Sequence, residues 1–432
     1  MRKGIILIAV LTLVVIILGM ASAYFSYVVT EKKALDRNLG LIKAFYIAEA
    51  GLDRCLSRLK NNITTNLTES FGEGFYSISA TNIGGLAYRL TSTGTAQNSL
   101  GDTLASKTFS IYVKETPFNV FSYFTNNEYF TQCSRGWCWQ TPVWFTTGDA
   151  LYGPIFTNSE FHIAGDPAFH GPVGSATDEI IYMNGGPPND NPYFDPAYDP
   201  NPSLGQDTID MPTFDDSNLQ DLKADAVNFT GDTKIDFIND GTMTVTNANK
   251  GWVNHNMALP AEKSVFVDGG NLYVSGTLDG EMTLGADTNA SGGKGNIVVT
   301  DNLRFKDRYD GAALRADPML ESSSTNYLGL VAGKDVIVDK NAPSDLEINA
   351  SIMALGDSFI VERWWDSNYN KGTLLVLGGI IQEERGPVGT FRGDTKISGF
   401  SKSYHYDERL LTKNLPYFPT TGEYEVVSWK RN

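Results

Sequence analysis

The chain has 432 residues, of which 41% are hydrophobic and 12% aromatic, with 42 glycines and a formal net charge of −16. This composition excludes a disordered chain and favours ordered, β-rich structure with two or more cores. The acidic balance argues against a polyanionic partner, so we expect no nucleic-acid partner, because phosphate binding needs clustered Lys and Arg.

The first segment runs for 25 residues, from Ile5 to Val29, without a charge. At about 1.5 Å per helical residue it is long enough to cross a hydrocarbon layer of about 30 Å. Three outcomes are open: a secretory signal cut after Ala21-Ser22-Ala23, an uncleaved membrane anchor, or removal of only Met1 to Gly4. Apolar character continues beyond Ala23, which favours a segment that stays on the mature chain.

A second helical stretch follows without an intervening proline. In AFYIAEAGLDRCLSRLK (residues 44–60) apolar positions recur at spacings of three and four, and the charged positions fall elsewhere. The apolar positions are Ala44, Ile47, Ala48, Leu52, Cys55, Leu56 and Leu59. This pattern predicts one helix over residues 5–60, apolar in its first half and amphipathic in its second, with Cys55 in the core.

A basic leader ending in Gly4, an apolar helix beginning at Ile5 and the downstream AFYIAEAGL together resemble the type IV pilin-like proteins. The similarity is to PilX-type minor pilins and to the tip pseudopilins of type II secretion, and it covers about the first 60 residues. The resemblance implies that a prepilin peptidase cleaves between Gly4 and Ile5. It also implies that the helix packs among other pilins as an inner-membrane assembly platform extrudes the filament.

The fifth position of the mature chain carries a glutamate in most members of that family, and here it is Ala9. The tip pseudopilins also lack this glutamate, so the resemblance implies a place at the filament tip.

Three segments of alternating character come next: GFYSISATNI, LAYRLTSTGTAQ and ASKTFSIYVKE. Each is short and rich in β-branched and aromatic residues, and turns containing glycine separate them. We expect an antiparallel pilin-like sheet over residues 61–116, with its apolar face against the amphipathic half of the helix.

An aromatic β region is expected over residues 117–258. Cys133 and Cys138 flank four residues in QCSRGWCWQ, at a predicted hairpin tip. An extracytoplasmic location would let them pair, and closing this small loop would stabilise the fold by about 2 kcal/mol; two free buried thiols are the alternative. Trp137, Trp139 and Trp144 would stack on sugars if exposed, but we expect core positions, where tryptophan in large β domains is more often found.

A loop rich in proline and aspartate is expected over residues 183–212, which hold seven prolines between Pro187 and Pro212. Four of its oxygen-bearing side chains have the chemistry of calcium ligands, but their spacing fits no EF-hand loop. They are Asp190, Asn191, Asp195 and Asp199. We expect a solvated acidic loop.

The region over residues 259–405 contains a repeat of apolar strand, Gly or Asp turn, and second strand. The turn glycines Gly333, Gly356 and Gly378 are 23 and 22 residues apart. A period of this size predicts coils stacked into a β-solenoid, with a β-sandwich as the alternative. Residues 406–432 form a C-terminal segment, and the fold class expected for the whole chain is α+β.

No stretch carries a complete catalytic or metal-binding motif. GLVAGKD lacks one residue of a phosphate loop and has Asp335 where that loop needs Ser or Thr. His162, His170, His255 and His405 are scattered. A basic cluster interleaved with acids predicts a solvated loop; it consists of Arg304, Lys306, Arg308 and Arg315. We therefore expect no enzyme, no cofactor and no metal.

The function expected from these features is that of a minor pilin or pilin-like subunit that caps or initiates a filament. Its β-solenoid would serve in adhesion or contact with a surface. The chain would lie in the inner membrane with an extracytoplasmic domain before assembly, and at the pilus tip or cell surface afterwards. The alternative is a membrane-anchored extracytoplasmic β-solenoid that binds or cleaves carbohydrate.

Overall fold

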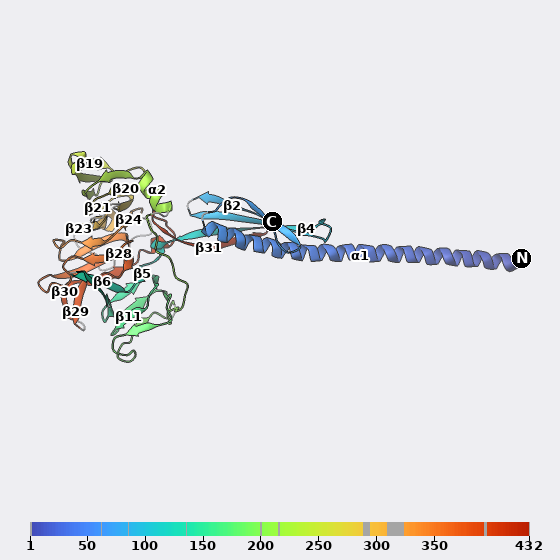
Figure 1. The fold of residues 1–432 in the computed structure, drawn as a ribbon, viewed down its shortest axis with the longest axis horizontal. Helices are drawn as coiled ribbons and strands as arrows, with labels where there is room; N and C mark the ends of the chain where they lie inside the picture. The colour runs from blue at the N-terminus through green and yellow to red at the C-terminus, as the bar shows by residue number, and fades with distance from the viewer. Residues whose placement is uncertain are drawn as a thin grey trace. The chain divides into compact units, whose positions relative to one another are not determined.

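The computed structural model describes residues 2–61, 63–84, 86–134, 136–198, 201–214, 217–287, 294–308, 324–392 and 395–431. The chain divides into two compact units. Unit 1 comprises Met1–Thr116 and Gly422–Asn432, and unit 2 comprises Pro117–Thr421. A long N-terminal helix and a large β-rich region confirm the α+β class (Figure 1).

Unit 1 begins with the helix α1 (Arg2–Lys60). Its apolar first part is long and apolar enough to cross a membrane, and its side chains lie exposed along a rod that extends beyond the sheet (Figure 1). The predicted apolar face of the second part is confirmed, because it packs into the core of this unit. The buried positions are Ala44, Ile47, Ala48, Leu52, Cys55 and Leu59, and Leu56 is partly buried against the same core.

The sheet of unit 1 has the order β1 (Leu67–Ser70), β2 (Gly74–Gly84), β3 (Ala87–Gln97), β4 (Thr103–Pro117) and β31 (Thr420–Arg431). The strands β1 to β4 pair in antiparallel fashion, and β2 to β4 match the three segments expected from alternation. Gly94 of β3 allows the helix to approach, because a Cβ there would lie 2.3 Å from the Ala44 carbonyl oxygen.

Unit 2 is built largely from parallel strands that stack in register in several ladders. The first ladder runs through β16 (Val227–Thr230), β20 (Ser264–Asp268), β22 (Glu281–Asp287), β24 (Tyr327–Ala332), β26 (Leu346–Ala354), β28 (Asn370–Glu384), β5 (Tyr123–Asn127), β10 (Ile155–Thr157) and β13 (Val173–Ser175). The second runs through β17 (Thr233–Ile238), β21 (Leu272–Leu278), β23 (Ile297–Phe305), β25 (Val336–Val338) and β27 (Phe359–Val361).

Unit 2 contains two further groups of parallel strands. One joins β28 to β30 (Thr395–His405), β9 (Ala150–Tyr152), β12 (Ala168–His170) and β15 (Tyr193–Phe194). The other contains β8 (Phe145–Thr146), β11 (Phe161–Ala164) and β14 (Ile180–Tyr182). Antiparallel additions are β18 (Thr242–Asn247) and β19 (Trp252–Ala258), β29 (Gly389–Arg392) against β30, and the hairpin of β6 (Tyr129–Ser134) and β7 (Trp137–Pro142).

The short helices of unit 2 are α2 (Ser217–Asp225) and the 3-10 turns Phe118–Val120, Ala248–Lys250, Lys306–Arg308 and Glu408–Leu411.

The stack in unit 2 does not follow chain order. β5 lies early in the sequence, yet it pairs in parallel with the second half of β28, with Tyr123 beside Ile380. The first strands of the unit therefore continue the stack that the later strands begin. A single row of buried side chains follows the first ladder from β20 to β13, one per strand: Val265, Leu284, Leu330, Ile352, Ile380, Tyr123, Ile155 and Val173. Burying each such side chain stabilises the unit by roughly 1.5–3 kcal/mol.

The three predicted turn glycines do not form one column. Gly333 and Gly356 lie in neighbouring bends, since a Cβ on Gly356 would be 2.6 Å from the Gly333 carbonyl oxygen. The turn expected at Gly378 is wrong, because this residue lies inside β28 and pairs with Ala350. It forms a corner within the strand: residues before it pair with β30, and residues after it pair with β5.

Candidate binding cavity

A cavity of about 380 Å³ opens in unit 2, bounded by β27, β8 and the segment Arg385–Val388. This segment has no strand conformation; Pro387 lacks the N–H that a ladder needs, and a Cβ on Gly386 would meet the Phe359 carbonyl oxygen at 2.0 Å. The volume lies within the range of about 300–1,000 Å³ that is typical of ligand sites.

The cavity wall combines aromatic side chains with a smaller number of polar ones. The aromatic members are Tyr123, Phe130, Trp144, Phe145, Phe359, Trp364, Phe391 and Tyr404. The polar members are Gln132, Thr141, Thr146, Thr147, Asn184, Gln382, Arg385, Thr390 and Lys402.

Arg385 is the most deeply buried charge at the cavity. Its guanidinium donates to Glu128 Oε2 at 2.7 Å and to the Val143 carbonyl oxygen at 3.1 Å, and its central carbon lies 3.6 Å from the Phe145 ring centroid. Glu128, which is fully buried, also accepts a hydrogen bond of 2.5 Å from the Thr125 hydroxyl. The charge of Arg385 is thus neutralised inside the wall.

Lys402 forms a second ion pair, with Asp149 Oδ2 at 2.6 Å. Burial lowers the pKa of Lys402, although the Asp149 carboxylate acts in the opposite direction. The pKa of Tyr404, which lies on the same strand, is well above its usual value because of burial first and of Asp149 second. Its hydroxyl therefore remains a hydrogen-bond donor throughout the physiological pH range.

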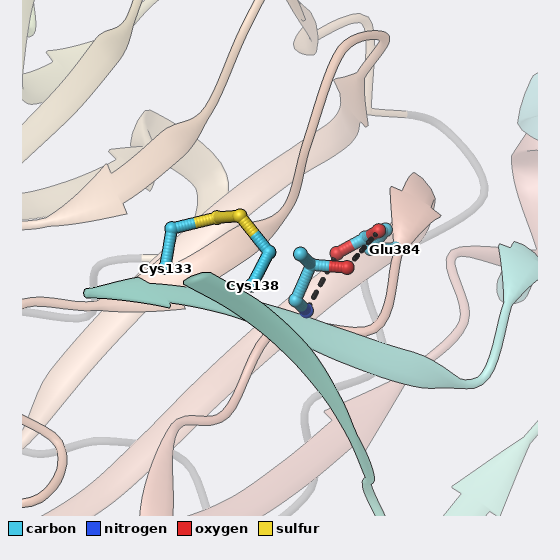
Figure 2. Close-up of a disulfide and its surroundings, with 4 residues drawn as sticks. Cys133, Cys138 and Glu384 are labelled. Atoms are coloured by element: carbon cyan, nitrogen blue, oxygen red, sulfur yellow. Dashed lines mark hydrogen bonds between the residues drawn. A yellow bond between two sulfur atoms is a disulfide. The ribbon is translucent and has the colours of Figure 1, made fainter. Parts of the chain in front are cut away.

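The hairpin β6–β7 closes one side of the cavity through Phe130 and Thr141. On its opposite face Cys133 and Cys138 form a disulfide. Figure 2 shows this disulfide beside two hydrogen bonds that Glu384 of β28 accepts from Thr131. The Thr131 backbone N–H donates at 2.8 Å and the Thr131 hydroxyl donates at 2.6 Å. The disulfide and Glu384 thus hold the hairpin in place.

The tryptophans of the hairpin are not in the core. Trp137 is 79% exposed and Trp139 is 48% exposed, so the core position expected for them is wrong. Trp144 is half-buried and lies at the cavity. The cause is local: the hairpin pairs only with itself, and its tip, which carries both tryptophans, lies in solvent.

The residues implied by the pilin resemblance all belong to α1. Ala9 is exposed on its apolar first part. Gly4 and Ile5 lie in the same helix, but the Ile5 side chain lies outside what the structure describes. The same holds for the side chain of Arg308, which ends a 3-10 turn, and Arg315 lies wholly outside the described residues. Arg304 does not lie in a solvated loop, because it sits on β23 and pairs with the buried Glu347 at 3.0 Å.

Most described residues of the proline-rich loop are exposed, and Asp190 is an exception. Asp190 is fully buried, and its carboxylate accepts hydrogen bonds from the N–H groups of Gly165 at 2.7 Å and Asn184 at 2.6 Å. These bonds lower its pKa, although burial acts in the opposite direction. Asp195 accepts from the Ala197 N–H at 2.9 Å; Asp199 lies outside the described residues. Asp190 therefore fixes the backbone of the loop.

The histidines occupy separate places. His162 is buried beside Tyr129 and Trp144, and His255 stacks on Trp252. His170 and His405 both stack on Tyr152, with ring centroids 4.6 Å and 5.1 Å away. Among the described residues no group of three or more His, Cys, Asp or Glu is placed to hold a metal ion.

The charged residues of the cavity were not singled out from the sequence, because each ion pair joins positions about 250 residues apart. Arg385 and Glu128 are separated by 257 residues, and Lys402 and Asp149 by 253. The sequence feature that could have pointed to these residues is a lone charge within an aromatic β segment, such as Glu128 in FTNNEYF.

Comparison with known proteins adds one match. A family model described as a domain of unknown function (DUF4900) matches residues 85–177, a range that runs from β3 through β13 and includes Glu128, Asp149 and the disulfide. That description names no activity or ligand. No curated protein and no solved structure matches this chain.

Proposed function

We propose that this protein is a minor pilin or pilin-like subunit that caps or initiates a filament and presents unit 2 for contact with a surface. The observation that carries the proposal is α1, an uninterrupted helix with an apolar first part and a second part packed on an antiparallel sheet. The short leader ending in Gly4 and the AEAGL stretch add sequence support.

Unit 2 is, in this proposal, a β-solenoid module. Its support is the row of in-register parallel pairings, in which each strand covers the hydrogen-bonding edge of the next. Its partners in assembly are other pilins, a prepilin peptidase and an inner-membrane assembly platform. After assembly the subunit is placed at a pilus tip or on the cell surface.

Mass analysis of the mature N-terminus tests this proposal. The expected chain begins at Ile5 and carries a methylated amine, and a Gly4→Val variant, which blocks the cleavage that the resemblance implies, should keep Met1. An intact Met1 in the native chain would contradict processing and favour a plain anchor. A chain that begins at Tyr24 would contradict both and indicate ordinary secretion.

A second candidate function is a membrane-anchored carbohydrate-binding protein that never enters a filament. The cavity, together with the exposed tryptophans beside it, favours this alternative. The same N-terminal analysis separates the two candidates, because only the pilin requires processing.

A further inference from the structure

The cavity has the chemistry of a site for a sugar ring. Trp144 and Trp364 are both half-buried at its wall, and Phe130 stands edge-on to Trp364, with ring centroids 5.9 Å apart. A sugar ring presents C–H groups on its faces, which pack on aromatic rings, and hydroxyl groups around its edge. The polar members of the wall supply donors and acceptors for that edge.

The charges at the cavity select for a neutral ligand. Arg385 and Lys402 are each paired with a carboxylate of the wall, at 2.7 Å and 2.6 Å, so neither cation is left to neutralise an anion. An acidic ligand would have to displace Glu128 or Asp149, which leaves a buried charge unpaired at a large cost. The net charge of −16 further disfavours an acidic glycan.

Tyr404 provides an unused donor. Its side chain lies at the cavity, and within the part of the chain that the structure describes its hydroxyl has no hydrogen-bond partner. Because Tyr404 is half-buried at the cavity, its hydroxyl can donate a hydrogen bond to a ligand there.

The hairpin extends this aromatic surface outward. In the β6–β7 register Gln132 is opposite Trp139 and Phe130 is opposite Thr141, so these four side chains share one face. Three of them, Phe130, Gln132 and Thr141, lie at the cavity. Trp139 therefore lies on the same face, farther toward the hairpin tip, where a longer glycan would pass.

We propose that the cavity binds the end of a neutral glycan, with one sugar ring between Trp144 and Trp364 and the next against Trp139. This inference deepens the surface-contact part of the proposed function, and it rests on that proposal only for the location of unit 2 outside the membrane.

Calorimetric titration of the full chain in a zwitterionic detergent without a sugar headgroup tests this inference. The probes are maltotriose, cellotriose and the N-acetylglucosamine trimer. At least one should bind, and Tyr404→Phe should weaken that binding by about tenfold, the effect of one lost hydrogen bond. Trp139→Ala should weaken it as well. Tyr198→Phe is the matched control, because Tyr198 is exposed and lies away from the cavity wall, and it should bind as the native chain does.

Three outcomes would overturn the inference: no probe binds at millimolar concentration, Tyr404→Phe and Trp139→Ala bind as tightly as the native chain, or an apolar dye occupies the cavity and no sugar displaces it. Failure here is distinguishable from failure of the pilin proposal. Glycan binding by a chain that keeps Met1 removes only the pilin, whereas a chain that begins at Ile5 and binds no sugar removes only the glycan site.

Discussion

Among single residues, Asp335 shows how the stacking of parallel strands can change the pKa of a carboxyl group. The residue follows the bend at Gly333, and its carboxylate accepts a hydrogen bond from the Ser358 N–H of the neighbouring strand connection at 3.0 Å. Burial, and then the negative charge of Asp357, raise the pKa of Asp335 from 3.8 to about 6. Register stacking thus brings two carboxylates together at one edge.

The stability of the protein should respond to this shift in a definite direction. Because the folded pKa lies above the unfolded value, the folded state binds the proton more tightly. The folded state is therefore favoured by this group below pH 3.8 and loses that advantage as the pH rises through about 6. The loss is at most about 3 kcal/mol.

Replacing Asp335 by Asn should raise the free energy of unfolding by about 1–3 kcal/mol at pH 8 and have little effect at pH 4. The amide oxygen keeps the bond to Ser358 but cannot ionise. Thermal melts of the two chains across this pH range measure the difference. Asp366→Asn is the control, because the Asn368 N–H and Arg363 lower the pKa of Asp366, so this variant should lose stability at pH 8. A pH-independent difference for Asp335→Asn would contradict the argument.

Among the elements, β28 explains why the repeat in the sequence was only partly interpretable. The segment LLVLGGIIQ has the same apolar–Gly–apolar pattern as the segments around Gly333 and Gly356. In the structure the first two glycines lie in bends between strands, whereas Gly378 lies at a corner inside one strand. A local pattern predicts that the chain changes direction, but it does not show whether the change separates two strands or forms a corner inside one strand.

Gly378→Ala should destabilise unit 2 by more than about 3 kcal/mol. The backbone has φ of +146°, and a Cβ would lie 2.1 Å from the Ala350 carbonyl oxygen of the neighbouring strand. Gly251→Ala is the matched control: φ is +69°, but no atom lies within 4 Å of its Cβ, so we expect a loss of about 1 kcal/mol. Urea unfolding compares the variants, and equal losses would show that the clash at Ala350 does not exist.

At the scale of the whole molecule, the features that the sequence predicts are those that depend on interactions between residues close together in the chain. The helix and the strands β2 to β4 were predictable because their periodicity is local. The pairing of β5 with β28 could not be predicted, because Tyr123 and Ile380 are far apart in the sequence and become neighbours only when the strands between them have stacked. The cavity was missed for the same reason, since Arg385 and Glu128, which are in contact, lie near opposite ends of the sequence of unit 2.

The proposed place of the whole subunit is the filament tip, and the argument begins at Ala9. In the resembled family, the carboxylate at this position neutralises the N-terminal amine of the subunit above. Without it, an amine placed in an apolar bundle would remain unpaired at a high cost. A subunit that lacks the carboxylate therefore joins first, where no subunit lies above it. The size of unit 2, residues 117–421, also suits a free end better than a packed shaft.

Immunogold labelling of sheared filaments should find the protein at one end, in low copy number. An Ala9→Glu variant restores the carboxylate and should label the shaft more often than the native chain does, whereas Ala9→Val, which stays apolar, should label only the end. Gold along the whole shaft with the native chain would contradict the tip position. No gold on any filament would contradict assembly itself and leave the apolar helix as a membrane anchor.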